Sequence, residues 1–177
     1  ELFSDPPSGK VREDNFDTDK AIAEIEMPTS QRGDVWLLGR HHLMCGDSTS
    51  QTDVQKLMGG ARAQCVFTDP PWNVDYGADA KHPSWKSRQI LNDKMSTEQF
   101  GAFLFAAFEA MKNVCEPGCM TYVVMSAQEW GNIMNSMRNT GYHWSSTIIW
   151  AKDSLVLSRK DYHTQYEPIW YGWLEGD

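Results

Sequence analysis

Residues 63–72 read Ala-Gln-Cys-Val-Phe-Thr-Asp-Pro-Pro-Trp, an apolar run that stops at a carboxylate, two prolines and an aromatic ring. The run predicts a short buried strand, and the prolines end it because proline has no backbone N–H to donate to a neighbouring strand. Ligands of open α/β sheets bind at the carboxyl ends of the strands. We therefore expect a functional site at Asp69, where this strand ends.

Strands and helices alternate on either side of this run. Helices are predicted from capping side chains at 47–49 to about residue 58, over 98–114 behind a Ser96–Gln99 capping box, and over 128–138. Strands are predicted over 34–38, 41–45, 64–68, 120–125, 144–150 and 167–173, with a turn at 116–118 and a long loop at 73–95. The alternation predicts an α/β fold with a doubly wound, largely parallel sheet.

Composition agrees with one folded domain. The chain has 177 residues, of which 41% are hydrophobic and 12% aromatic, and the tryptophans at 150, 170 and 173 are expected in the core. No apolar run approaches the roughly 20 residues that span a bilayer. The four cysteines do not resemble a disulfide framework, so a reducing cytoplasm is expected. Cys115 and Cys119 lack a second Cys or His pair at suitable spacing, and no metal site is expected.

Acidic side chains are concentrated at the start of the chain. We interpret residues 1–31 as a linker and residues 32–177 as the folded part. The net charge of −8 is unfavourable for binding phosphates, which requires Lys and Arg. A surface that grips DNA would therefore lie elsewhere in a longer protein, or this chain does not grip DNA strongly.

The residues at 69–72 suit methyl transfer to an exocyclic amine. The lone pair of such an amine is delocalised into the base, and two acceptors of its N–H groups can turn the lone pair toward an electrophilic methyl group. Asp69 supplies a carboxylate, and Pro70 supplies a backbone carbonyl that Pro71 stiffens. Trp72 could stack on a base taken out of the duplex, with Tyr76 on its other side. The alternative is that residues 69–72 form a strand-ending turn with a surface aromatic.

The chain resembles the amino-terminal half of the β-class DNA amino-methyltransferases, especially the modification methylases of phage and prophage type. The stretches that carry the resemblance are 33–49, 66–76, 92–95, 148–152 and 166–172. The resemblance implies a Rossmann-like methyltransferase fold, with 32–177 as the amino-terminal part of the catalytic domain. It implies S-adenosylmethionine as methyl donor and double-stranded DNA with a flipped base as substrate.

The resemblance also implies roles for individual residues. Asp69, Pro70, Pro71 and Trp72 would form the catalytic motif, and Trp72 and Tyr76 would hold the base. Asp47, Asp69 and Pro70 would contact the cofactor. Adenine N6 is the expected target. Cytosine N4, RNA adenine and a non-catalytic relative that binds DNA or a partner chain are the alternatives.

One expected segment is missing from the sequence. The family has a glycine-rich motif of the type Asp-Pro-Phe-x-Gly-x-Gly that binds the methionine part of the cofactor, and no such pattern occurs in these 177 residues. We therefore expect an incomplete sheet and weak or no cofactor binding by this chain alone. A downstream half of the same enzyme would supply the rest of the cofactor site.

Overall fold

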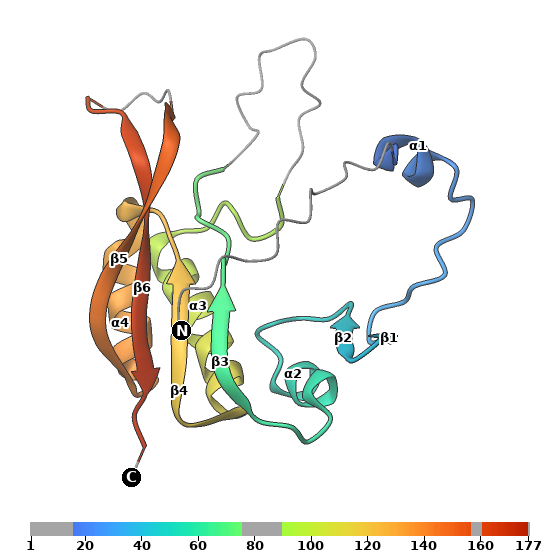
Figure 1. The fold of residues 1–177 in the computed structure, drawn as a ribbon, viewed down its shortest axis with the longest axis horizontal. Coiled ribbons are helices and arrows are strands. Elements are labelled where there is room, and N and C mark those ends of the chain that lie inside the picture. Colours follow the sequence, from blue (N-terminus) through green and yellow to red (C-terminus); the bar gives the residue numbers. More distant parts are fainter. Residues whose placement is uncertain (1–15, 76–89, 157–160, 177) are drawn as a thin grey trace, which may run out of the picture. The chain divides into compact units, whose positions relative to one another are not determined.

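The computed structural model describes residues 16–75, 90–156 and 161–176 (Figure 1). The chain divides into two compact units, Glu1–Gln31 and Arg32–Asp177. The described part of the first unit contains helix α1 (Thr18–Ala23), and the Asp17 side chain caps it by accepting a hydrogen bond from the Lys20 backbone N–H at 3.0 Å. The linker role of residues 1–31 stays a prediction.

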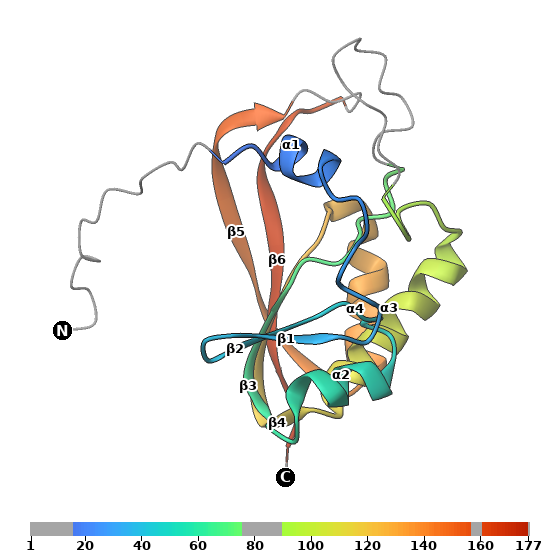
Figure 2. The same ribbon diagram turned by 90° about the vertical axis from the view of Figure 1, so that its right-hand side faces the viewer.

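The second unit is built on a mixed four-stranded sheet. Its strands are β3 (Ala63–Thr68), β4 (Cys115–Val124), β5 (Tyr142–Val156) and β6 (Thr164–Leu174), in the spatial order β3-β4-β6-β5. Strands β3 and β4 are parallel, and the helix α3 (Thr97–Lys112) connects them. The short helix η1 (Ala127–Glu129) and α4 (Trp130–Asn139) follow β4. Figure 2 shows α3 and α4 on the same face of the sheet.

The predicted α/β class and the incomplete sheet are confirmed, but the prediction of a largely parallel sheet is wrong. In the described part only β3 and β4 run parallel, whereas β6 is antiparallel to both β4 and β5. Residues 157–163 are the whole connection between β5 and β6. A parallel crossover needs about a dozen residues or more, so this short connection joins antiparallel neighbours. The turn predicted at 116–118 lies within β4, where Gly118 has a φ of 77°.

A small hairpin and a helix precede the sheet. Strands β1 (Val35–Leu38) and β2 (His41–Met44) form a separate two-stranded sheet, which turns at Gly39 as predicted. Helix α2 (Gln51–Met58) follows. Its cap is Ser50, one residue after the capping side chains predicted at 47–49. The Ser50 Oγ accepts a hydrogen bond from the Asp53 N–H at 3.2 Å.

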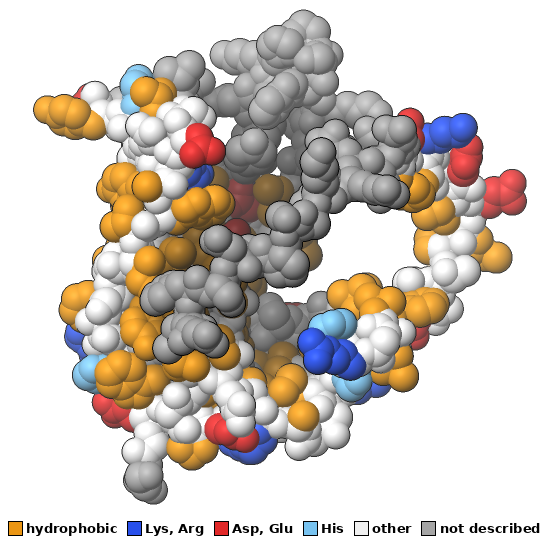
Figure 3. Space-filling view, in the orientation of Figure 1, with side chains coloured by type: hydrophobic (Ala, Val, Ile, Leu, Met, Phe, Trp, Pro, Cys, Tyr) orange, Lys and Arg blue, Asp and Glu red, His pale blue; other side chains and the backbone are white. Residues whose placement is uncertain are grey.

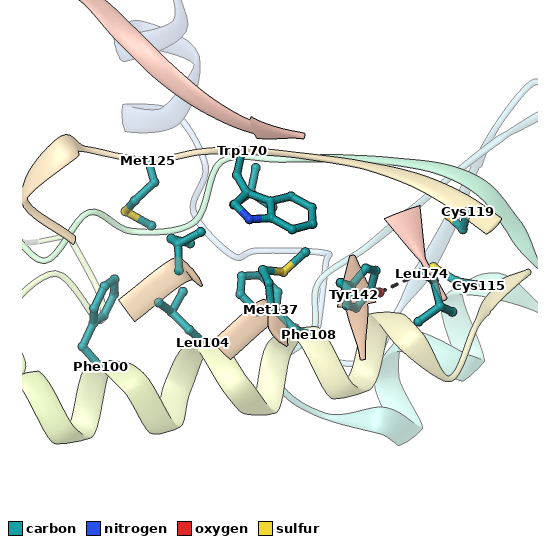
Figure 4. Packing of buried hydrophobic residues seen from close by; sticks show 12 residues of the cluster. Phe100, Leu104, Phe108, Cys115, Cys119, Met125, Met137, Tyr142, Trp170 and Leu174 are labelled. Carbon is teal, nitrogen blue, oxygen red and sulfur yellow. Dashed lines mark hydrogen bonds between the residues drawn. The ribbon is translucent and has the colours of Figure 1, made fainter. Parts of the chain in front are cut away.

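The core lies between the sheet and helices α3 and α4. Figure 4 shows Phe100, Leu104 and Phe108 directed from α3 toward Trp170 of β6. The predicted capping box is confirmed, since Ser96 and the Gln99 side chain bond each other's backbone N–H groups. No helix in the described residues is long and apolar enough to cross a bilayer.

The opposite face of the sheet carries hydrophobic side chains (Figure 3), and no described helix of this unit covers it (Figure 2). Phe67, Tyr122 and Tyr171 form a row across β3, β4 and β6, with ring centroids 6.1 Å and 4.9 Å apart. Only one of the three tryptophans expected in the core is buried. Trp170 points to the helical face, whereas Trp150 and Trp173 are 56% and 36% exposed. We call this surface the open sheet face.

Candidate functional site

Asp69 lies directly after β3, at the carboxyl end of the strand, as the sequence predicts. Its side chain is exposed, while Pro70, Pro71 and Trp72 are half-buried. The Trp72 indole Nε1–H donates a hydrogen bond of 2.8 Å to Asp69 Oδ1. The Trp72 side chain also packs against the buried core. The turn at 69–72 therefore holds one carboxylate oxygen in place and presents the group at the edge of the sheet.

The second oxygen of Asp69 has no hydrogen-bond partner among residues 16–75, 90–156 and 161–176. A carboxylate oxygen in this state can accept an N–H from a ligand. The Trp72 contact was not foreseen from the sequence, which assigned this ring to base stacking. Because the indole N–H bonds Asp69 and the ring contacts the core, orienting the carboxylate is a second role for Trp72. The stacking role stays a prediction.

The three residues after Trp72 are tied to the segment before α3. The Asn73 side chain accepts a hydrogen bond from the Met95 N–H at 2.7 Å and donates to the Met95 carbonyl at 3.1 Å. The Val74 N–H donates to Asp93 Oδ1 at 3.1 Å, and the Asp75 N–H donates to the Asp93 carbonyl at 2.7 Å. The two ends of the predicted loop at 73–95 therefore meet at the site.

Glu129 joins this network from the carboxyl end of β4. Its Oε1 accepts a hydrogen bond from Asn73 Nδ2 at 3.3 Å, and its Oε2 accepts one from Asn132 Nδ2 at 2.6 Å. Sequence reasoning missed Asn73, Asp93 and Glu129. A signal was present only for Asn73, because Asn tolerates the left-handed backbone and Asn73 has a φ value of 56°.

Asp47 is engaged in a local turn before α2. Its Oδ1 accepts hydrogen bonds from the Thr49 N–H at 2.9 Å and the Thr49 hydroxyl at 2.7 Å, and Arg32 lies 3.5 Å from Oδ2. The bonds from Thr49 are the main reason that the pKa of Asp47 is lowered. None of its described hydrogen bonds reaches residues 63–75, so the structure does not join it to Asp69. Its cofactor role stays a prediction, and Tyr76 lies outside the described residues.

Ser126 is an unexpected polar group beside the site. It follows β4, the parallel neighbour of β3, and its side chain is buried with no hydrogen-bond partner for Oγ within the described part of the chain.

Cys115 and Cys119 are also buried, and the Tyr142 hydroxyl lies 4.0 Å from Cys115 Sγ (Figure 4). No group of three or more His, Cys, Asp or Glu side chains in the described segments is placed to hold a metal ion.

Comparison with known proteins relates this geometry to one family. The DNA methylase family profile, named for N6 and N4 methyltransferases, matches residues 63–173. Solved structures similar to the chain include M1.HpyAVI, with 11% identity and a TM-score of 0.46 over 71% of this chain and 54% of that one. TTHA0409 of Thermus thermophilus, a candidate DNA modification methylase, has 20% identity and a TM-score of 0.43 over 66% of this chain and 48% of its own.

The chain spans about half the length of the solved structures that it matches. No curated protein matches it significantly. The family profile covers more than half of the chain, from the first residue of β3 to the penultimate residue of β6, and so includes Asp69 and parts of all four strands of the sheet. The chain therefore belongs to the N6/N4 DNA methylase family.

Proposed function

We propose that this chain is the base-handling part of a DNA methyltransferase that transfers a methyl group from S-adenosylmethionine to the N6 amine of adenine. The observation that carries the proposal is the way in which the Asp69 carboxylate is held. One oxygen of its carboxylate is fixed by the Trp72 indole N–H at 2.8 Å, and the other is open at the carboxyl end of β3. A member of the DNA methylase family with an acceptor in this position has the group that amine methylation needs.

The residues of the turn act on the amine by positioning it. Asp69 accepts one N–H of the amine and the Pro70 carbonyl accepts the other, so that the nitrogen lone pair points away from both acceptors. When bound, S-adenosylmethionine would supply the methyl group from its sulfonium sulfur, which would leave as a neutral thioether as the methyl–nitrogen bond forms. The methylated nitrogen then carries one proton too many, and we assign the Asp69 carboxylate, which holds the amine, as the acceptor of that proton.

The described residues fit one end of the cofactor. The exposed Asp69 carboxylate suits the sulfonium cation electrostatically, and we assign Pro70 and Asp47 as further contacts. The methionine and adenosine parts need a cradle that this sequence lacks in its expected glycine-rich form. A downstream half of the enzyme would supply that cradle. The open sheet face, with Phe67, Tyr122 and Tyr171 in a row, is a surface that such a half could cover.

Base binding rests on two aromatic residues. We assign Trp72 and Tyr76 to the faces of the flipped base, in a modification methylase that acts on duplex DNA in the cytoplasm. Cytosine N4 is the second candidate target, since two N–H acceptors serve either amine equally.

Transfer of a labelled methyl group tests the proposal. The chain is incubated with methyl-labelled S-adenosylmethionine and unmethylated duplex DNA, alone and with a downstream segment that carries the glycine-rich motif, and the labelled nucleoside is identified. N6-methyladenine is the expected product, formed only when the downstream segment is present. N4-methylcytosine as the labelled product would show that the target is the N4 amine of cytosine, the second candidate, and not the N6 amine of adenine. No label in either mixture would contradict catalysis and favour the non-catalytic relative.

A further inference from the structure

Asn73 stands next to the catalytic turn, and its amide makes hydrogen bonds that bring three segments together. The Oδ1 atom accepts from the Met95 N–H, and the Nδ2 group donates to the Met95 carbonyl and to Glu129 Oε1. Reversing the amide would place a donor against the Met95 N–H and an acceptor against a carbonyl and a carboxylate. The partners therefore determine which position of the amide group is the oxygen and which is the nitrogen.

The backbone at this point is one that few side chains tolerate. Asn73 and Asp75 both have positive φ values, 56° and 52°, and the Val74 N–H between them bonds to Asp93. Asp93 is 4% exposed, and Lys94 pairs with Asp75 at 2.8 Å. Left-handed conformations cost free energy in residues other than glycine and persist where the surroundings hold them. Here the bonds to residues 93–95 hold all three residues after Trp72.

Glu129 links this strained segment to the neighbouring strand. Both of its oxygens are engaged, Oε1 by Asn73 and Oε2 by Asn132. Because η1 follows β4, the Asn73–Glu129 bond joins the segments that leave the two parallel strands at the same edge of the sheet. Asn73, which directly follows the turn at 69–72, therefore holds the end of the turn opposite to Asp69.

We propose that Asn73 and Glu129 form a positioning pair that holds the turn at 69–72 in its methyl-transfer geometry, which rests on the function proposed above. The pair acts through Trp72: fixing residue 73 fixes the indole, and the indole N–H fixes Asp69. An amide suits position 73, because its oxygen accepts from the Met95 N–H while its nitrogen donates to the Met95 carbonyl and to Glu129. A carboxylate there would face the Glu129 carboxylate.

Two substitutions and their combination test the pair. Asn73→Asp keeps the size and the bond from the Met95 N–H but sets two carboxylates against each other. Glu129→Gln in the same chain gives residue 129 an amide that can donate to the new carboxylate. Asn73→Gly removes the side chain at a φ that glycine tolerates, and it serves if Asn73→Asp does not fold. Asn135→Asp makes the same chemical change on the exposed surface of α4 and is the matched control.

The first measurement is the 15N–1H signal of the Trp72 indole in the 177-residue chain, assigned by its loss in Trp72→Phe. It needs neither cofactor nor DNA. We expect Asn73→Asp and Asn73→Gly to shift or broaden this signal, Asn73→Asp with Glu129→Gln to return it part of the way, and Asn135→Asp to leave it unchanged. An indole signal that is the same in Asn73→Asp, Asn73→Gly and Asn135→Asp would overturn the proposal.

The second measurement is methyl transfer in the mixture that is active. A misplaced acceptor costs about tenfold to a hundredfold in kcat. We expect a loss in this range for Asn73→Asp, with KM for DNA changed less than about twofold and part of kcat recovered by Glu129→Gln. A loss confined to KM, or none, would overturn the positioning role. If no mixture transfers methyl groups, the function proposed above fails, while the indole signal still decides whether the pair holds the turn.

Discussion

Replacing Trp72 by Phe separates the two roles that the indole could have. Phenylalanine keeps an aromatic ring that can stack on a base, but it has no N–H to donate to Asp69. A hydrogen bond to a charged group contributes about 1.5–3 kcal/mol. Because Asp69 is exposed to solvent, the lower end of that range applies. A loss of about 1.5 kcal/mol in transition-state stabilisation lowers the rate about tenfold.

The assay is methyl transfer from labelled S-adenosylmethionine, with kcat and KM for DNA measured separately. We expect Trp72→Phe to lower kcat about tenfold, and Trp72→Leu, which has neither the N–H nor the ring, to lower it further and to raise KM for DNA. Trp36→Phe is the control, since Trp36 is an exposed tryptophan of β1. Full activity in Trp72→Phe, together with a loss in Trp72→Leu, would refute the orienting role and leave stacking as the function of this ring.

Three further substitutions or measurements test the site and its surroundings. Asp69→Ala should abolish transfer and lower the free energy of unfolding by no more than about 1.5 kcal/mol, because the side chain is exposed and makes one described hydrogen bond; activity equal to the parent's would remove Asp69 from the mechanism. Ser126→Ala should stabilise the fold by about 1 kcal/mol in denaturant unfolding, since it removes a buried hydroxyl without a partner, and a stability below the parent's would mean that Oγ has a partner. Burial, with Cys115 beside it, raises the pKa of the Cys119 thiol to about 12. At pH 8 iodoacetamide should therefore alkylate the exposed Cys45 and Cys65, whereas Cys119 should react only when the chain unfolds.

The sequence predicted the elements of the site better than their partners. The strand predicted over 64–68 and the position of Asp69 followed from an apolar run that ends at two prolines, which is a local signal. The predicted burial of this strand is wrong, because every residue of β3 is at least partly exposed. The capping box of α3 is equally local, and it too is confirmed. By contrast, the bonds from Asn73 to Met95 and Glu129 join residues 22 and 56 positions apart. No periodicity within one sequence reports such pairs.

Strand direction was mispredicted for a related reason. An apolar run such as 167–173 indicates a strand, but it does not say which neighbour the strand pairs with. The length of the connection carried that information, since residues 157–163 are too few for a crossover. The core position predicted for Trp150 and Trp173 is also wrong. Both lie on the face of the sheet that the described helices of this unit leave open, because successive residues of a strand point to opposite faces.

The charges of the described residues do not favour strong binding to the phosphates of DNA. Five of the described Lys and Arg side chains lie within ion-pair distance of a carboxylate, namely those of Lys20, Arg32, Lys94, Lys112 and Lys152. Side chains paired in this way are poor partners for phosphate, because binding DNA would first break the pair. The chain as a whole has a net charge of −8, which adds a general repulsion. We therefore expect the proposed methyltransferase to hold the amine through this part of the chain and to bind the phosphates of the duplex mainly through other residues. Since each phosphate contact adds about one unit to the salt dependence of binding, the isolated chain should bind DNA weakly and with a shallow salt dependence, and a downstream half that supplies the grip should steepen it.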